Sequence, residues 1–435
     1  MALDRRRLLT AAAASPIAAL SSSFPPSARA SIVSGKIDPK RLDSVGALLE
    51  RLVNEGKIAG GAARVAINGE SVFERCAGMA DIASGRAIAP DTIYRLYSMT
   101  KPVTAAAVMA LVDDGKLKLD DPVEKFVPEF ENLTVYVGEE DGEIRTEPAQ
   151  TMRIINLLTH TSGISNSWTP GPIAPIYREL GLISGKFIHD PNINGLADVA
   201  ARMAKAPLQF QPGTQWLYSF SPDIAGLVVE RASGLSFGDF LKQSIFEPLG
   251  MTDTDFHVPP EKSARLANMY SLKEDSLILA EAADGSPFLN KPSAESGASG
   301  LLSTLGDFGK FASMLARDGK LNGKRVLSKH AARQMLSSTV STEILGESLA
   351  RFMAFGAGGS GGGMGFGLCG AVLLDPALSD APGTKGEYTW GGAASTTFFV
   401  APQLGLDAVL MTQLFPSGTL PLLDLLKTAV YEAVV

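Results

Sequence analysis

The chain has 435 residues, of which 45% are hydrophobic and 20% are charged. This composition is ordinary for a globular protein, and the length allows one large core or two domains. The formal net charge is -7 and no block of like charges follows the first ten residues, which argues against nucleic-acid binding.

The first 30 residues have the layout of an export signal. Three arginines at 5–7 precede a short apolar segment, and the small-residue motif Ala-Arg-Ala follows at 28–30. This order is typical of a secretory signal, and the arginine cluster is similar to a twin-arginine signal. We therefore expect a periplasmic protein whose fold begins at residue 31. The alternative is a cytoplasmic protein with a disordered basic leader.

No later segment has about 18 uninterrupted apolar residues, so we expect no stable membrane association. Residues 40–56 carry apolar side chains at helical spacing, which ends at Gly56. The dipeptide Asn68-Gly69 separates two β-rich runs and predicts a hairpin. Helical spacing returns at 102–114, with Gly115 as the stop.

Residues 116–290 are rich in proline and glycine and show few strand patterns. Helices are predicted there at 196–205, 222–233 and 236–246. Strands are predicted at 367–376, 395–402 and 406–413, and a last helix at 420–434. The prediction is an α+β fold in which residues 31–115 and 291–435 together build a sheet domain, and residues 116–290 form a mostly helical domain.

Ser98 and Lys101 lie three residues apart at the start of the predicted helix, as Ser98-Met99-Thr100-Lys101. On a helix, residues at this spacing share a face. A serine hydroxyl becomes a nucleophile when a neighbouring base takes its proton, and an uncharged lysine is such a base. Burial and a helix N-terminus both favour the uncharged amine. An exposed lysine is the competing interpretation.

Two further segments carry candidate groups. Tyr218 lies between a Pro-Gly turn and the helix predicted from 222, where a tyrosine beside a lysine can relay the serine proton. Its alternative is a core aromatic side chain. Trp390-Gly391-Gly392 is predicted to begin a strand on which a substrate approaches the backbone closely, with N–H groups that complete an oxyanion hole. Its alternative is a plain β-bulge.

Six segments follow one another in a specific order after residue 40. They are YRLYSMTK at 94–101, LLTHTSGI at 157–164, FQPGTQWLYS at 210–219, IFEPLGMTDTDF at 245–256, SGASGLLSTLGDFGKFASML at 296–315 and TWGG at 389–392. Together they resemble the serine β-lactamase-like superfamily, which includes class C β-lactamases, D-alanyl-D-alanine carboxypeptidases and family VIII carboxylesterases. The esterase branch is the most similar.

The resemblance implies a role for each candidate. Ser98 is the acylated nucleophile, Lys101 accepts its proton and Tyr218 is the second general base. The backbone N–H groups of Ser98 and Ala393 form the oxyanion hole. The implied fold is an antiparallel sheet flanked by helices, with the site in the cleft beside a helical domain, and no cofactor is implied.

Two boxes depart from the β-lactamase pattern. Tyr218-Ser219-Phe220 lacks the asparagine of Y-x-N, and Trp390-Gly391-Gly392 lacks the lysine of K-T-G. Lys385 lies five residues before Trp390 and cannot take the same strand position. A lost charge-assisted contact weakens the binding of carboxylate-bearing substrates by about 1.5–3 kcal/mol.

We therefore expect a serine carboxylesterase that cleaves short- to medium-chain acyl esters of small molecules. The alternatives are a β-lactamase or D-alanyl-D-alanine carboxypeptidase, and a non-catalytic penicillin-binding-like sensor. The oligomeric state is left open.

No metal or nucleotide site is expected. The four histidines show no metal-ligand spacing, and His160 resembles a structural position of the superfamily. The glycine run at 356–367 matches G-x-G-x-x-G, but a strand-like segment follows it where a dinucleotide loop opens a helix. The two cysteines, Cys76 and Cys369, are predicted to be buried free thiols.

Overall fold

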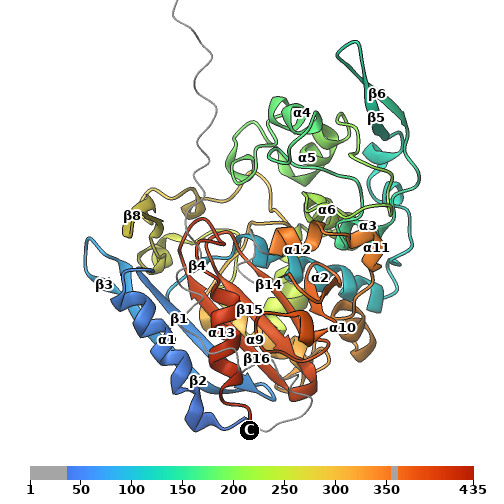
Figure 1. Ribbon diagram of the computed structural model, residues 1–435. Coiled ribbons are helices and arrows are strands. Elements are labelled where there is room, and N and C mark those ends of the chain that lie inside the picture. The colour runs from blue at the N-terminus through green and yellow to red at the C-terminus, as the bar shows by residue number, and fades with distance from the viewer. Residues whose placement is uncertain (1–36, 354–360) are drawn as a thin grey trace, which may run out of the picture.

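The structure, a computed structural model, describes residues 37–353 and 361–435, so the predicted export signal lies outside the described residues. Its centre is an eight-stranded antiparallel sheet with the order β12-β13-β14-β15-β16-β1-β2-β3 (Figure 1). The strands are β1 (Gly60–Ile67), β2 (Glu70–Asp81), β3 (Arg86–Ala87), β12 (Met364–Phe366), β13 (Ala371–Leu373), β14 (Tyr388–Gly391), β15 (Thr397–Ala401) and β16 (Leu406–Thr412). The two ends of the chain therefore build one sheet.

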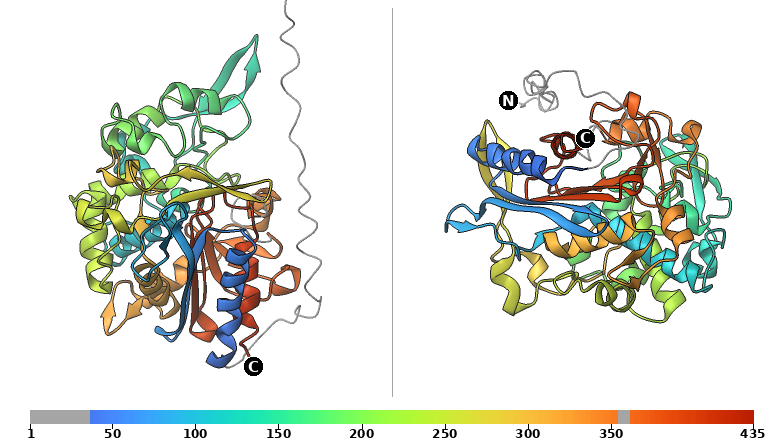
Figure 2. Two further views of the ribbon diagram at one scale, coloured as in Figure 1. Left: turned by 90° about the vertical axis from the view of Figure 1, so that its left-hand side faces the viewer. Right: turned by 90° about the horizontal axis from the view of Figure 1, so that it is seen from below.

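Helices cover both faces of this sheet. Helices α1 (Asp43–Asn54) and α13 (Leu422–Tyr431) lie on one face and α9 (Leu305–Ala316) lies on the other (Figure 2). The central strands β15 and β16 are accordingly buried along their whole length. Strands covered on both faces are expected to contain continuous apolar runs, as these two do at 398–401 and 408–411.

Helix α2 (Thr100–Asp113) runs through the interior and packs against α6 (Ser221–Ser233) and α10 (Lys329–Met335). Its residues from Thr100 to Leu111 are all buried. A helix that is apolar on all sides is a core helix. The side chains of its first turn, Lys101 among them, are therefore fixed by packing and shielded from solvent.

The remaining elements surround this core. The helices are α3 (Ile154–Leu158), α4 (Ile173–Glu179), α5 (Gly195–Met203), α7 (Phe237–Leu241), α8 (Glu247–Leu249), α11 (Thr342–Leu345) and α12 (Ser348–Phe352). The short strand pairs are β4 (Tyr94–Arg95) with β9 (Leu302–Ser303), β5 (Thr134–Glu140) with β6 (Glu143–Pro148), β7 (Met269–Lys273) with β8 (Ser276–Glu281), and β10 (Lys320–Leu321) with β11 (Lys324–Arg325). Among the described residues, no helix is both long and apolar enough to cross a bilayer.

The α+β prediction is confirmed, and three local expectations are wrong. The middle of the chain contains two hairpins, β5–β6 and β7–β8, where few strands were expected. The strand predicted at 367–376 shrinks to β13, because Cys369 adopts a φ of 57° and turns the chain between β12 and β13. The helix predicted at 236–246 divides into α7 and a following π turn, Lys242–Phe246. The domain boundaries after residues 115 and 290 stay a prediction.

Candidate active site

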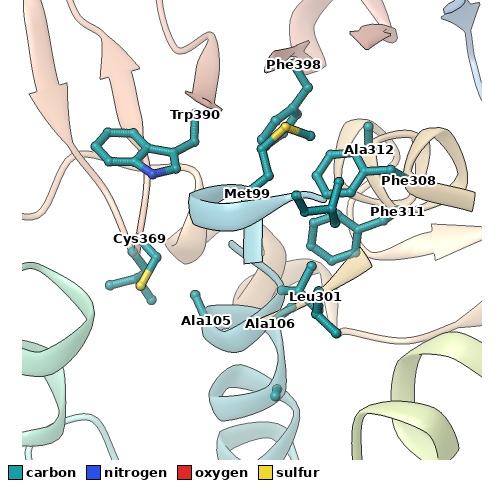
Figure 3. Close-up of a cluster of buried hydrophobic side chains, with 14 of the residues drawn as sticks. Met99, Ala105, Ala106, Leu301, Phe308, Phe311, Ala312, Cys369, Trp390 and Phe398 are labelled. Carbon is teal, nitrogen blue, oxygen red and sulfur yellow. The ribbon is translucent and has the colours of Figure 1, made fainter. Parts of the chain in front are cut away.

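Ser98 lies in a 3₁₀ turn, Tyr97–Met99, which leads directly into α2. The side chain of Met99 is fully buried in the apolar core that Phe308 and Phe398 also line (Figure 3). Ser98 itself is half-buried, so the turn presents its hydroxyl while the next residue anchors it. Tyr97 has a φ of 44°, a left-handed conformation that costs a residue with a side chain about 1–3 kcal/mol. The packing of the turn offsets this strain.

Lys101 and Tyr218 both reach the oxygen of Ser98. The Tyr218 hydroxyl donates a hydrogen bond to Ser98 Oγ at 2.6 Å. Lys101 Nζ lies 3.3 Å from the same oxygen and donates to the carbonyl of Ala298 at 2.7 Å. Lys101 is only 3% exposed, so the interpretation of an exposed lysine is wrong. Its amine also lies 4.5 Å above the Tyr218 ring.

Tyr218 is held by its neighbours on several sides. The Asn166 side chain donates to the Tyr218 carbonyl at 2.8 Å, and the ring packs on Phe352 at 4.1 Å and on His160 at 4.9 Å. His160 is fully buried, and burial holds the pKa of its imidazole well below its usual range. Its Nδ1 lies 3.2 Å from the Ser219 hydroxyl. A neutral His160 therefore supports the tyrosine from behind.

Trp390 and Gly391 end strand β14 and do not begin a strand, which corrects the prediction. Gly391 pairs with Thr397 of β15 in unbroken register, so the β-bulge interpretation is also wrong. The Trp390 side chain is 1% exposed and stacks on Phe352, with ring centroids 5.6 Å apart and planes 13° apart. The tryptophan therefore forms part of the wall beside Tyr218.

Gly392 brings the next residue to the nucleophile. A Cβ at this position would lie 2.1 Å from the carbonyl oxygen of Leu96, two residues before Ser98, so only glycine fits there. The turn after β14 thus packs against the nucleophile turn and places Ala393 beside it. Within the described part of the chain, the N–H groups of Ser98 and Ala393 take part in no backbone hydrogen bond. Both donors are therefore free to receive an oxyanion.

A buried carboxyl group behind Lys101 was missed in the sequence. Asp223 Oδ1 accepts hydrogen bonds from the Ser296 hydroxyl at 2.5 Å and from the Ala298 N–H at 3.2 Å. Because the Ala298 carbonyl holds Lys101, one residue connects the carboxyl group to the amine. Burial raises the pKa of Asp223 to about 6, while Ser296 and Lys101 act in the opposite direction. In sequence, Asp223 follows a proline in the first turn of α6 and looks like an ordinary helix start.

The other expectations concern metals, thiols and the glycine run. Among the described residues, no group of three or more His, Cys, Asp and Glu side chains is arranged to hold a metal ion. Both cysteines are free, but Cys76 is only half-buried. Part of the glycine run lies outside the described residues, and strand β12 begins within its described part, at Met364.

A family model and two relatives agree on one family, and a solved structure shares the fold. A model of the Beta-lactamase family matches residues 45–430. Esterase EstB of Burkholderia gladioli is 32% identical over 90% of this chain and 94% of its own length. Lovastatin esterase of Penicillium rubens is 30% identical over 80% and 87% of the two chains. The solved structure of EstCE1, described as a hydrolase with promiscuous acyltransferase activity, has a TM-score of 0.76 at 24% identity and covers 90% of this chain and 99% of its own.

Proposed function

We propose that this chain cleaves short- to medium-chain acyl esters through an acyl-enzyme on Ser98. The chain belongs to the beta-lactamase family and is a serine ester hydrolase. One observation carries the proposal. Ser98 Oγ is contacted at once by the Tyr218 hydroxyl at 2.6 Å and by the Lys101 amine at 3.3 Å. A hydroxyl between two proton-carrying groups is the arrangement that nucleophilic catalysis requires.

The proposed reaction has two halves. Ser98 Oγ attacks the ester carbonyl, its proton passes to the Tyr218–Lys101 pair, and the N–H groups of Ser98 and Ala393 stabilise the oxyanion. When the carbonyl reforms, the bond to the alcohol oxygen breaks and the proton moves to that oxygen. A water molecule then attacks the acyl carbonyl and gives its proton to the Tyr218–Lys101 pair. The bond from the carbonyl carbon to Ser98 Oγ breaks, Oγ takes the proton back, and the acid leaves. The amine of Lys101, 4.5 Å above the tyrosine ring, stabilises negative charge on either oxygen during the transfer.

The residues in the two boxes that depart from the β-lactamase pattern favour esters over β-lactams as substrates. At the lysine position of K-T-G stands the buried Trp390, and Lys385 lies exposed before β14 begins. At the asparagine position of Y-x-N stands Phe220, whose ring packs on Phe187 at 5.4 Å and on Tyr177 at 5.9 Å. A substrate carboxylate or amide thus finds no matching side chain at either position, and the site suits an uncharged substrate.

A series of p-nitrophenyl esters from acetate to laurate tests the proposal. We expect turnover that is highest for short to medium acyl chains and absent in Ser98→Ala. Full activity in Ser98→Ala, or no turnover of any ester by the wild type, would refute the role of Ser98. A parallel assay with a chromogenic cephalosporin tests the β-lactamase alternative. Efficient lactam turnover without ester turnover would establish that alternative. Failure of a fluorophosphonate probe to label the wild type would favour a non-catalytic sensor.

We also propose that the protein is exported to the periplasm. The support is the order of residues 1–30, with arginines at 5–7 and a small-residue motif at 28–30. Replacing the arginines at 5 and 6 by lysine is expected to retain the esterase in the cytoplasm. Cell fractionation followed by the ester assay measures this, and equal distribution of wild type and variant would contradict export by this signal.

A further inference from the structure

Four aromatic side chains form a continuous row beside the nucleophile. The ring of Trp168 lies 6.2 Å from that of Tyr218, Tyr218 lies 4.1 Å from Phe352, and Phe352 lies 5.6 Å from Trp390. Trp390 is buried and Phe352 is half-buried, whereas Trp168 is 51% exposed. The row therefore extends from the core to the surface and passes Ser98 at Tyr218. These separations are those of favourable ring contacts.

Trp168 is exposed but held in place. Asn166 Oδ1 accepts from the N–H groups of Trp168 at 2.9 Å and of Thr169 at 2.7 Å, while its Nδ2 donates to the Tyr218 carbonyl at 2.8 Å. Arg178 donates to the carbonyl of Ser167, immediately before the tryptophan, at 2.5 Å. One asparagine thus fixes the indole segment to the backbone of the tyrosine. A binding contact that is ordered beforehand costs little entropy when a ligand arrives.

The proton path decides which part of a substrate meets Trp168. The group that takes the proton of Ser98 is also the group that returns it to the departing oxygen, so the alcohol part of the ester lies on the side of Tyr218. The ring beyond Tyr218 on its exposed side is Trp168, and the ring packed closest to it is Phe352. Aromatic rings pack favourably on one another in stacked or edge-to-face arrangements, so the row suits a partner that carries an aromatic ring.

We propose that Trp168, beside Tyr218, forms a subsite for an aromatic alcohol portion, so that the substrates are esters of arylmethyl or phenolic alcohols. The inference rests on the proposed esterase function and names the substrate class of that site. In the acylation step, the Ser98 Oγ–carbonyl bond forms, the bond from the carbonyl carbon to the aryl alcohol oxygen breaks, and that oxygen receives the serine proton. The aryl ring stays against Trp168 until the alcohol leaves.

Benzyl butyrate and cyclohexylmethyl butyrate form a matched pair for the test. They share the acyl group and the primary-alcohol linkage and differ only in whether the six-membered ring is aromatic. The wild type is expected to have a KM for benzyl butyrate about three- to tenfold below that for cyclohexylmethyl butyrate. Trp168→Ala is expected to bring the KM ratio close to one, and Trp168→Phe to keep part of it.

Val137→Ala is the control, because Val137 is 50% exposed on the β5–β6 hairpin, which extends away from the body of the protein (Figure 1). Its KM ratio is expected to equal that of the wild type. Equal KM values for the two esters in the wild type, or a KM ratio that Trp168→Ala leaves unchanged, would overturn the subsite. Turnover of p-nitrophenyl butyrate in the same preparation would still support the esterase function. If none of the three esters is turned over, the proposed function falls and the subsite falls with it.

Discussion

Two buried carboxyl groups, Asp223 and Asp407, share the same burial and differ in their partners. Both are fully buried, and burial raises the pKa of each to about 6. Both oxygens of Asp407 are used, one by Arg64 at 2.9 Å and the other by Ser313 at 2.8 Å. Asp223 receives both of its hydrogen bonds on Oδ1, and its Oδ2 has no partner in the described part of the chain.

The partners place one carboxyl group in the sheet and the other beside the candidate active site. Arg64 of β1 joins Asp407 of β16 to the Gly309 carbonyl of α9, so this pair ties together the two halves of the chain that build the sheet. Asp223 instead ties α6 to the segment that carries Ala298 and, through it, to Lys101. Burial and pKa alone do not distinguish the two carboxyl groups, whereas their contacts do.

The largest effect is expected in the region of Asp223, at Tyr218. Tyr218→Phe removes the hydroxyl that contacts Ser98 at 2.6 Å and leaves the ring packing on Phe352 and His160 in place. The loss of a positioned proton carrier predicts a fall in kcat of about 10²- to 10⁴-fold for p-nitrophenyl butyrate. Thermal unfolding serves as the control, with a Tm near that of the wild type. A variant with wild-type kcat would remove Tyr218 from the reaction.

In the region of Asp407, a substitution is expected to lower the free energy of unfolding and to leave the activity unchanged. Arg64→Met removes the cation and leaves Asp407 buried without it, which costs about 3–5 kcal/mol of unfolding free energy. Urea unfolding measures this loss. The activity per folded molecule should stay at the wild-type level, because Arg64 lies in the sheet and contacts none of the site residues. A variant that keeps its stability but loses activity would reverse the assignment of the two regions.

The pH dependence of stability tests whether burial raises the pKa of Asp407. Asp407 has a pKa of about 6 in the folded protein and an ordinary value of 3.8, so between pH 4 and 6 the folded state holds a proton that the unfolded state has lost. Stability therefore falls as the pH rises through this window. Relative to Asp407→Asn, the wild type is expected to lose about 1–3 kcal/mol between pH 4 and 6.5. Urea unfolding at each pH measures the difference, and a constant difference would contradict the shifted pKa.

Much of the fold was predictable because its signals are local. Asn68-Gly69 predicted the β1–β2 hairpin, with φ values of 52° and 81° that suit these two residues, and apolar spacing predicted α1 and α2. The β5–β6 hairpin was missed because its strands are mostly exposed, so they lack the alternation of apolar and polar residues that marks a half-buried strand. The dipeptide Asp141-Gly142 at its turn is the local signal that favours this hairpin.

The site was predictable where residue spacing or family resemblance carried it. The i, i+3 spacing of Ser98 and Lys101 placed two groups together. The turn before a predicted helix made Tyr218 a candidate, and the resemblance gave it the role of second general base. Asp223 was beyond reach because its meaning depends on Ser296, 73 residues away, and on the Ala298 carbonyl. Trp168 was beyond reach for the same reason, since only the folded chain puts its ring next to Tyr218.

Asp223→Asn is expected to have the smallest effect, and it separates the roles of the two carboxyl groups. The amide keeps the shape and an acceptor oxygen for Ser296 and Ala298 but carries no charge near Lys101, so we expect kcat/KM to fall about 10- to 100-fold with little loss of stability. Asp223 is ionised above its pKa of about 6, so the wild-type kcat/KM should rise between pH 5 and 7, and that limb should be absent from the variant. Asp407→Asn is the matched control and should keep the limb. A limb that persists in Asp223→Asn would show that this carboxyl group, like Asp407, only supports the fold.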